Sequence, residues 1–180
     1  MKKHFSTIKV MVIALGLIMA FSVSVFADVS ISKINYKGSG KVQVTFSGKV
    51  SYNDTKVTIE DNNGVSYDAS VMSKDNKNIQ FVIKRYKTGR TYTFTISGVS
   101  KESFSGSFKI IAKNIAITTA KNTAKKKWKA TEFSDVSAKS STYKGTSVWK
   151  VSFKSGNSKY VYMVTQQKGK VIYYEKKKAE

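Results

Sequence analysis

Apolar and polar residues alternate in short runs between Val29 and about Ile111, a pattern typical of β-strands. The clearest runs cover residues 42–46, 57–60, 79–83 and 92–96, and a looser one covers 104–108. Gly-, Asn- and Asp-rich turn sequences separate the runs. Strands at this spacing predict an all-β, antiparallel sandwich of about seven strands over residues 28–111.

The pattern changes after residue 111, where alternation gives way to an apolar residue at every fourth position. This stripe consists of Ala116, Ala120, Ala124 and Trp128. It predicts a helix over residues 114–128, with Thr118 or Thr119 as its N-terminal cap. The cations of residues 125–127 suit the negative end of the helix dipole.

Strand-like runs follow the helix at residues 133–138, 147–154, 159–165 and 170–175. In the second run Trp149, Val151 and Phe153 share one face, so Lys150 and Lys154 point the other way. The order predicts a small α+β domain over residues 112–180, with one helix and a three- or four-stranded antiparallel sheet. We expect Trp149 to have a structural role in its core.

The stretch from Tyr86 to Ile96 resembles the large-x-x-Gly-x-x-Tyr corner of fibronectin type III and bacterial immunoglobulin-like domains. The resemblance implies an immunoglobulin-like sandwich in which the ring of Tyr92 packs in the core and its hydroxyl bonds backbone at the turn. Gly89 would supply the permissive turn backbone. This resemblance concerns the fold and names no ligand.

The second region resembles the PepSY domain, a module of thermolysin-type propeptides and of other exported bacterial proteins. The resemblance rests on the helix with Ala120 and Ala124, on strands 148–153 and 160–164, and on the closing segment 169–172. It implies contact with a protease or another envelope protein, whose activity this domain would restrain.

Residues 1–27 have the organisation of a secretory signal peptide: a start with three lysines, an apolar middle and a small residue, Ala27, at the exit. The alternative is an uncleaved membrane anchor, since the apolar run is about long enough to span a bilayer. We expect cleavage before Asp28 and a soluble product that is secreted or associated with the cell wall. A protein of this kind without Cys fits a Gram-positive bacterium.

Composition excludes several chemistries. The 180 residues include no Cys, and the single His, His4, falls in the predicted signal peptide. Thiolate and His-based catalysis and Cys- or His-ligated metals therefore have no residues to use. Seven carboxylates remain as candidates for a glycosidase-type pair, and most of them lie in turn sequences. These are Asp54, Glu60, Asp61, Asp68, Asp75, Glu132 and Asp135. We expect no enzyme, no cofactor and no metal.

Positive charge is the strongest anomaly. The chain carries 32 basic and 11 acidic residues, and removal of residues 1–27 leaves a net charge of +18. The lysines concentrate in the second domain among Tyr and Trp residues. The candidate partner-binding surface consists of Lys125, Lys126, Lys127, Lys150, Lys154 and Lys159. The alternative is a Lys-rich surface that has no ligand.

These observations predict an exported, non-enzymatic binding protein of the bacterial cell envelope that contacts a protein, such as a protease, through the PepSY-like domain. The alternative is a wall or matrix adhesin whose lysines hold an anionic polymer such as teichoic acid. Export argues against nucleic acid as the partner.

Overall fold

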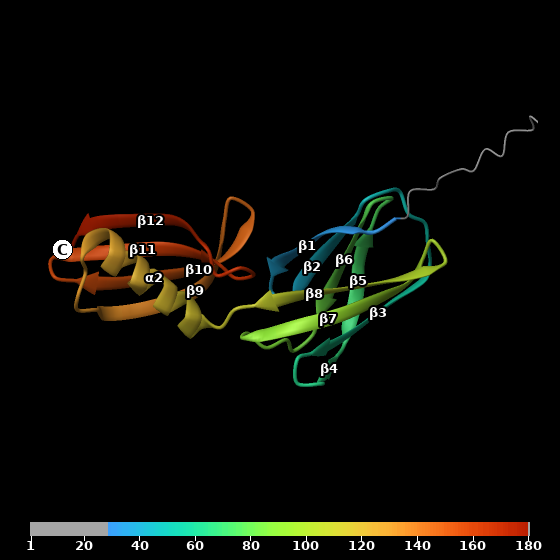
Figure 1. The fold of residues 1–180 in the computed structure, drawn as a ribbon, viewed down its shortest axis with the longest axis horizontal. Helices are drawn as coiled ribbons and strands as arrows, with labels where there is room; N and C mark the ends of the chain where they lie inside the picture. Colours follow the sequence, from blue (N-terminus) through green and yellow to red (C-terminus); the bar gives the residue numbers. More distant parts are fainter. Residues whose placement is uncertain (1–28, 180) are drawn as a thin grey trace, which may run out of the picture.

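The computed structural model describes residues 29–179, which form twelve β-strands and one helix. Two packed assemblies follow each other along the chain (Figure 1). We call residues 31–110 the sheet pair and residues 113–178 the helix–sheet unit. The predicted signal peptide, residues 1–27, lies outside the described residues.

The sheet pair contains two four-stranded antiparallel sheets of orders β1-β2-β6-β5 and β4-β3-β7-β8. The strands of the first are β1 (Ile31–Gly38), β2 (Lys41–Phe46), β5 (Ala69–Lys74) and β6 (Asn78–Ile83). Those of the second are β3 (Tyr52–Asp61), β4 (Ser66–Tyr67), β7 (Arg90–Val99) and β8 (Glu102–Ile110). The predicted antiparallel β structure is confirmed, with eight strands where the sequence indicated about seven.

The alternating apolar side chains of both sheets meet in one buried cluster. Val42, Val44 and Phe81 on the first sheet and Tyr92 and Ile96 on the second are all fully buried. Burial of large apolar side chains stabilises a fold by about 1.5–3 kcal/mol each. The two sheets are therefore held together by the apolar side chains that alternate along their strands.

The turn between β6 and β7 is bonded to a core side chain. The hydroxyl of Tyr92 donates to the backbone oxygen of Lys87 at 2.6 Å and accepts the backbone N–H of the same residue at 2.7 Å. Gly89 in this turn has φ +83°, a conformation that L side chains rarely adopt. The buried ring of Tyr92 thus fixes a turn that would otherwise leave two backbone groups without partners.

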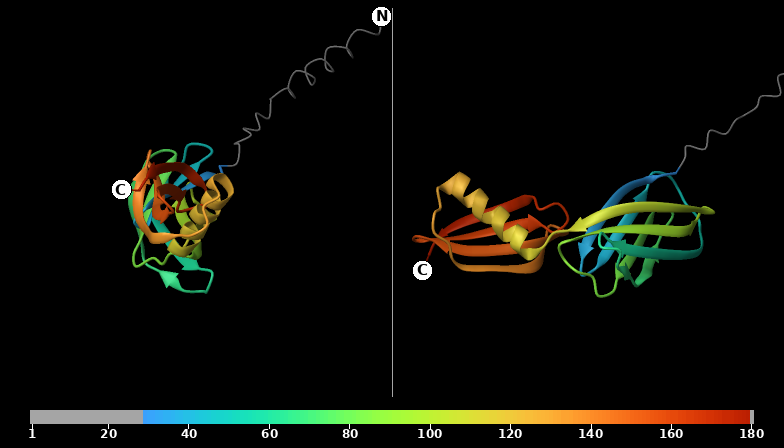
Figure 2. Two further views of the ribbon diagram at one scale, coloured as in Figure 1. Left: turned by 90° about the vertical axis from the view of Figure 1, so that its left-hand side faces the viewer. Right: turned by 60° about the horizontal axis from the view of Figure 1, so that its bottom comes forward.

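The helix–sheet unit has one helix, α2 (Lys113–Trp128), lying across a sheet of order β12-β11-β10-β9 (Figure 2). Its strands are β9 (Ser134–Tyr143), β10 (Thr146–Ser155), β11 (Ser158–Thr165) and β12 (Val171–Lys178). The helix buries Ala116, Ala120 and Ala124 against the sheet. The small side chains of the three alanines allow the helix to approach the sheet closely.

Both ends of α2 differ in detail from the sequence prediction. Ala112 is the N-cap residue and no side chain caps it, so the predicted cap at Thr118 or Thr119 is wrong. Both threonines lie inside the helix, and Thr119 Oγ1 donates instead to the backbone oxygen of Ile115. At the other end Trp128, the last member of the apolar stripe, is 36% exposed.

The sheet pair and the helix–sheet unit contact each other directly. Ile111, which follows β8, makes two of the bonds. Its backbone N–H donates to the backbone oxygen of Gln166 at 2.8 Å, and its backbone oxygen accepts the indole N–H of Trp149 at 3.1 Å. The side-chain amide of Gln167 accepts the N–H of Tyr36 and donates to the oxygen of Ile34, both at 3.1 Å. The side-chain amide of Gln167 therefore pairs with one N–H and one C=O group of β1, as the backbone of a neighbouring strand would.

Tyr92→Phe tests the hydroxyl bonds of the corner. The ring stays and only the hydroxyl is lost, which leaves the Lys87 N–H and C=O unpaired in a partly buried turn. We expect the free energy of unfolding to fall by about 1–2 kcal/mol. Urea unfolding followed by NMR signals of the sheet pair measures this change, and an unchanged midpoint would show that the hydroxyl bonds contribute nothing.

Candidate functional site

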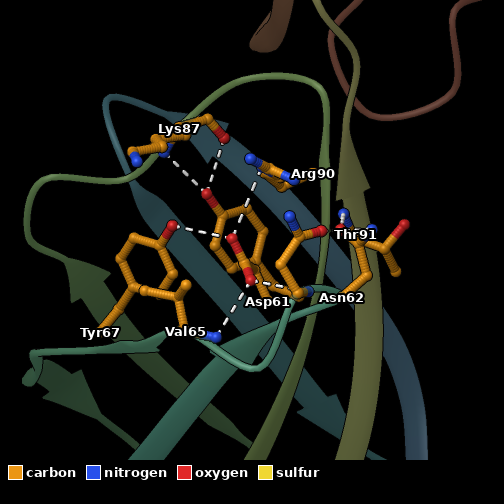
Figure 3. Close-up of polar contacts among 9 residues, drawn as sticks. Asp61, Asn62, Val65, Tyr67, Lys87, Arg90 and Thr91 are labelled. Atoms are coloured by element: carbon orange, nitrogen blue, oxygen red, sulfur yellow. Dashed lines mark hydrogen bonds and ion pairs between the residues drawn. The ribbon is translucent and has the colours of Figure 1, made fainter.

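Asp61, at the end of β3, is the most buried of the candidate carboxylates, with 4% of its surface exposed. One oxygen, Oδ1, accepts the backbone N–H groups of Asn63 at 2.9 Å and Val65 at 3.2 Å. The other, Oδ2, accepts the Tyr67 hydroxyl at 2.9 Å and faces Arg90 Nε at 3.6 Å (Figure 3). This carboxylate thus accepts three hydrogen bonds and has one ion-pair partner.

These contacts set the protonation state of Asp61. Burial by itself raises the pKa of this carboxyl, but the donated hydrogen bonds and the Arg90 guanidinium outweigh burial and lower the pKa below its ordinary value. Burial and the bond to Asp61 raise the pKa of Tyr67 to about 12, so Tyr67 remains a neutral donor. A buried carboxylate with a lowered pKa that is held by three hydrogen bonds is a poor general base. Asp61 fixes the β3–β4 turn.

Two other candidate carboxylates also have structural partners. Asp75 accepts the backbone N–H groups of Lys77 and Asn78, which closes the β5–β6 turn. Asp135 pairs with Lys154 at 2.9 Å on the surface. Between residues 29 and 179, no group of three or more His, Cys, Asp or Glu side chains is placed to hold a metal ion.

The six lysines of the predicted basic surface do not form one surface. Lys125, Lys126 and Lys127 are exposed on α2, which covers the sheet face that carries Val151 and Phe153. Lys150 and Lys154 alternate with these residues and therefore lie on the opposite face. Lys159, directly opposite Lys154, belongs to that second face as well. The predicted site is two separate basic regions, divided by the sheet.

Register extends the basic region on the sheet beyond the predicted residues. Lys139 on β9 lies directly opposite Lys150, and Lys177 on β12 lies directly opposite Lys159. Directly opposite residues in an antiparallel pair point to the same face. We call this surface the lysine face, and it consists of Lys139, Lys150, Lys154, Lys159 and Lys177.

The lysines of this face form two rows across the strands. One row pairs Lys139 with Lys150, and the other continues from Lys154 through Lys159 to Lys177. Like charges directly opposite each other on neighbouring strands destabilise a sheet. Three adjacent pairs of this kind on one small sheet are a cost that packing elsewhere has to offset.

Two acids lie on the lysine face, and each is already paired. Asp135 contacts Lys154 and Glu175 contacts Lys177, both at 2.9 Å. The bond to Glu175 and its charge raise the pKa of Lys177, so this lysine stays charged. Exposed pairs of this kind contribute little to stability. Five lysines against two acids leave the face with a formal charge of +3.

Aromatic residues close the end of the lysine face that is nearest the sheet pair. Tyr143 on β9 and Tyr173 on β12 belong to the two outer strands, yet their ring centroids are 5.1 Å apart. The sheet must therefore coil strongly at this end, and beneath the tyrosines Val148 is fully buried. The exposed part of the face is the lysine-rich remainder.

A second aromatic group lies on the helix side. The rings of Trp128 and Tyr174 contact edge to face at 6.4 Å, and both remain more than one-third exposed. Lys127 Nζ lies 4.1 Å from the Tyr174 ring, and Lys176 Nζ lies 5.2 Å from the Trp128 ring. These cation–π contacts fasten the C-terminal end of α2 to β12.

Trp149 lies on the helix side of β10, as its alternation with Lys150 indicates. It is partly buried against the core of the helix–sheet unit, and its indole N–H is bonded to Ile111. Trp149 therefore contributes in two ways. Its ring helps to keep the apolar residues of β10 on the helix side, and its N–H attaches the segment that leads into α2.

The comparison with protein-family models finds no match for this chain, and the comparison with curated proteins finds none. Within residues 29–179, α2 falls short of the length and apolar character that crossing a membrane requires. The lysine face and the two aromatic groups are therefore interpreted from their geometry alone.

Asp61→Asn tests the role of the buried carboxylate. A pKa that is lower in the folded state than in the unfolded chain stabilises the fold at neutral pH, and this stabilisation is lost as the pH falls from about 4 through the folded value. We expect Asp61→Asn to unfold at lower urea than the parent at pH 7. The difference should shrink at pH 3. A difference that is equal at both values would show that ionisation of Asp61 does not stabilise the fold.

Trp149→Ala tests the phase of β10. Loss of the packed ring and of its bond to Ile111 should destabilise the helix–sheet unit by about 3 kcal/mol, the lower end of the range for a core aromatic, since Trp149 is only partly buried. Trp149→Phe, which keeps a ring and loses the N–H, should cost about 1 kcal/mol. Thermal unfolding followed by the remaining Trp128 fluorescence measures both. Unchanged stability of Trp149→Ala would mean that this side chain is not part of the core.

Proposed function

We propose that this chain is an exported, non-enzymatic binding protein of the bacterial cell envelope. In this proposal residues 28–111 form an immunoglobulin-like domain that serves as spacer or receptor module. Residues 112–180 form a PepSY-like α+β domain, and its lysine face holds an anionic polymer such as teichoic acid. Of the two ligand classes that the sequence leaves open, the geometry of the sheet favours the polymer.

The two lysine rows are the observation that carries this proposal. Each row places lysine residues directly opposite one another on neighbouring strands, whose backbones are about 4.8 Å apart. An anion that lies across a row turns a repulsive contact into an attractive one. Relief of this repulsion would add to the binding free energy. A ligand that binds only the folded state also stabilises that state.

The spacing of the rows favours a chain of anions over a single one. Lys150 and Lys154 are four residues apart along β10, which corresponds to about 13 Å. One small anion cannot reach both rows, whereas a polymer with a charge in every repeat can neutralise both. The seryl pair Ser137 and Ser152 lies between the rows and offers hydroxyl groups to such a ligand.

A non-enzymatic role agrees with the state of the carboxylates. Asp61 accepts three hydrogen bonds and faces Arg90, and Asp135 and Glu175 are paired with lysines on the surface. The pKa of Asp61 is lowered, the reverse of what a general acid needs, and Asp135 and Glu175 are held by surface lysines.

A protein partner, such as a protease that the domain restrains, is the second candidate function. The exposed apolar residues on the helix side favour it: Trp128 is 36%, Ile172 39% and Tyr174 41% exposed. Trp and Tyr are enriched in the centres of protein interfaces. This patch lies on the sheet side opposite to the lysine face, so the two candidates use different residues.

Lys154→Gln/Lys159→Gln/Lys177→Gln tests the polymer hypothesis. The measurement is the dissociation constant for poly(glycerol phosphate) teichoic acid across a series of salt concentrations. Each lysine near an anionic surface contributes on the order of 1 kcal/mol, so we expect up to about a hundredfold weaker binding at low salt. The salt dependence should become less steep because fewer counterions are released.

The matched control is Lys56→Gln/Lys101→Gln/Lys109→Gln, which removes the same charge from exposed positions of the sheet pair. It should bind almost as the parent does. Equal loss in both variants would mean that net charge alone attracts the polymer. A stoichiometric complex with an envelope protein that survives moderate salt, and that Trp128→Ala abolishes, would favour the protein partner instead.

A further inference from the structure

A cavity of about 270 Å³ lies where the sheet pair meets the helix–sheet unit. Its lining includes Lys33 from β1, Thr146 from the start of β10, and Thr165, Gln167, Lys168 and Lys170 from the β11–β12 turn. Ligand sites occur preferentially at such junctions, and pockets for drug-sized molecules measure roughly 300–1,000 Å³. A smaller cavity of this kind suits a single compact group.

The lining is strongly cationic. Lys33 approaches from one side of the junction and Lys168 and Lys170 from the other, and the lining contains no Asp or Glu. The cavity therefore carries a formal charge of +3. Like charges on the two sides oppose contact between the sheet pair and the helix–sheet unit, and a bound anion would remove that repulsion.

Hydrogen bonds hold the walls of the cavity in place. In the β11–β12 turn, Lys170 N–H donates to Thr165 Oγ1 at 3.0 Å and Thr165 N–H donates to Lys170 O at 2.8 Å. Gln167 is fixed to β1 by both ends of its amide. The stems of Lys168 and Lys170 thus start from a rigid turn, so less ordering is needed when a ligand binds.

The remaining groups are donors suited to an oxyanion. Thr165 Oγ1 accepts from Lys170 N–H, which leaves its hydroxyl hydrogen free to donate. Gln167 Nε2 uses one hydrogen on Ile34 and retains a second. Three ammonium groups with such donors match the charge and the several oxygens of a phosphoryl dianion better than they match a single carboxylate.

We propose that this junction cavity binds a phosphoryl group, as inorganic phosphate or as the end of a phosphate monoester. The site shares no residue with the lysine face and does not rest on the proposed function. Binding joins Lys33 to Lys168 and Lys170 through one anion and so stiffens the connection between the sheet pair and the helix–sheet unit.

Titration of the 15N-labelled protein with inorganic phosphate, glycerol 3-phosphate and succinate, at constant ionic strength, tests this proposal. We expect both phosphate ligands to shift the backbone amide signals of residues 34–36, 146–147 and 165–170. Succinate, a dicarboxylate dianion, should bind at least tenfold more weakly. Preference for glycerol 3-phosphate over inorganic phosphate would identify a monoester as the ligand, and the reverse would identify the free ion; both results support the site.

Lys168→Gln/Lys170→Gln should weaken phosphate binding about tenfold or more. The control Lys56→Gln/Lys101→Gln removes the same charge from exposed positions of the sheet pair, outside both proposed sites, and should change the affinity less than twofold. Equal weakening in both variants, equal affinity for succinate, or phosphate shifts confined to the lysine face would each overturn the proposal. Polymer binding by the lysine face is measured separately, so either site can fail without the other.

Discussion

The phase of alternation on β10 is the constraint on which the helix–sheet unit depends. Val151 and Phe153 must face the alanines of α2 to form a core, and this requirement places Lys150 and Lys154 on the other face. A slip of one residue would bury two lysines and expose the core. Because the apolar phase is so strongly determined, the lysines are collected on one surface without any direct interaction between them.

The alternation on β10 also determines how the sheet pair and the helix–sheet unit are attached to each other. With Trp149 on the helix side, its indole N–H reaches the oxygen of Ile111, the residue that connects β8 to α2, and Gln166 binds the N–H of that residue. Gln167 then lies against β1. Backbone groups that would otherwise be unpaired between the two assemblies are thereby satisfied. The same arrangement brings Lys33, Lys168 and Lys170 around one cavity.

Local sequence pattern predicts what depends on local geometry. Alternation indicated most strands and the side of Trp149, and the four-residue spacing of the alanines indicated the helix. Lys139 and Lys177 were missing from the predicted basic surface because strand pairing, not local sequence, brings them there. Lys139 is 11 residues from its partner Lys150, and Lys177 is 18 residues from its partner Lys159. The separation of Lys125–Lys127 from Lys150 depends on which sheet face the helix covers. The cavity depends on contacts more than 100 residues apart.

Charge acts in two different ways in this molecule. A net charge of +18 over residues 28–180 attracts any polyanion at long range, and this attraction falls as salt shortens the Debye length. The lysine face and the junction cavity differ from that background because strand register or a bonded turn brings the backbones of their lysines close together. Fixed repulsion of this kind is a cost in the free protein that diffuse surface charge does not carry. Asp135 and Glu175 relieve part of it on the lysine face. In the two proposed sites a bound anion would relieve the rest, so the position of the lysines, and not only the total charge, would set selectivity.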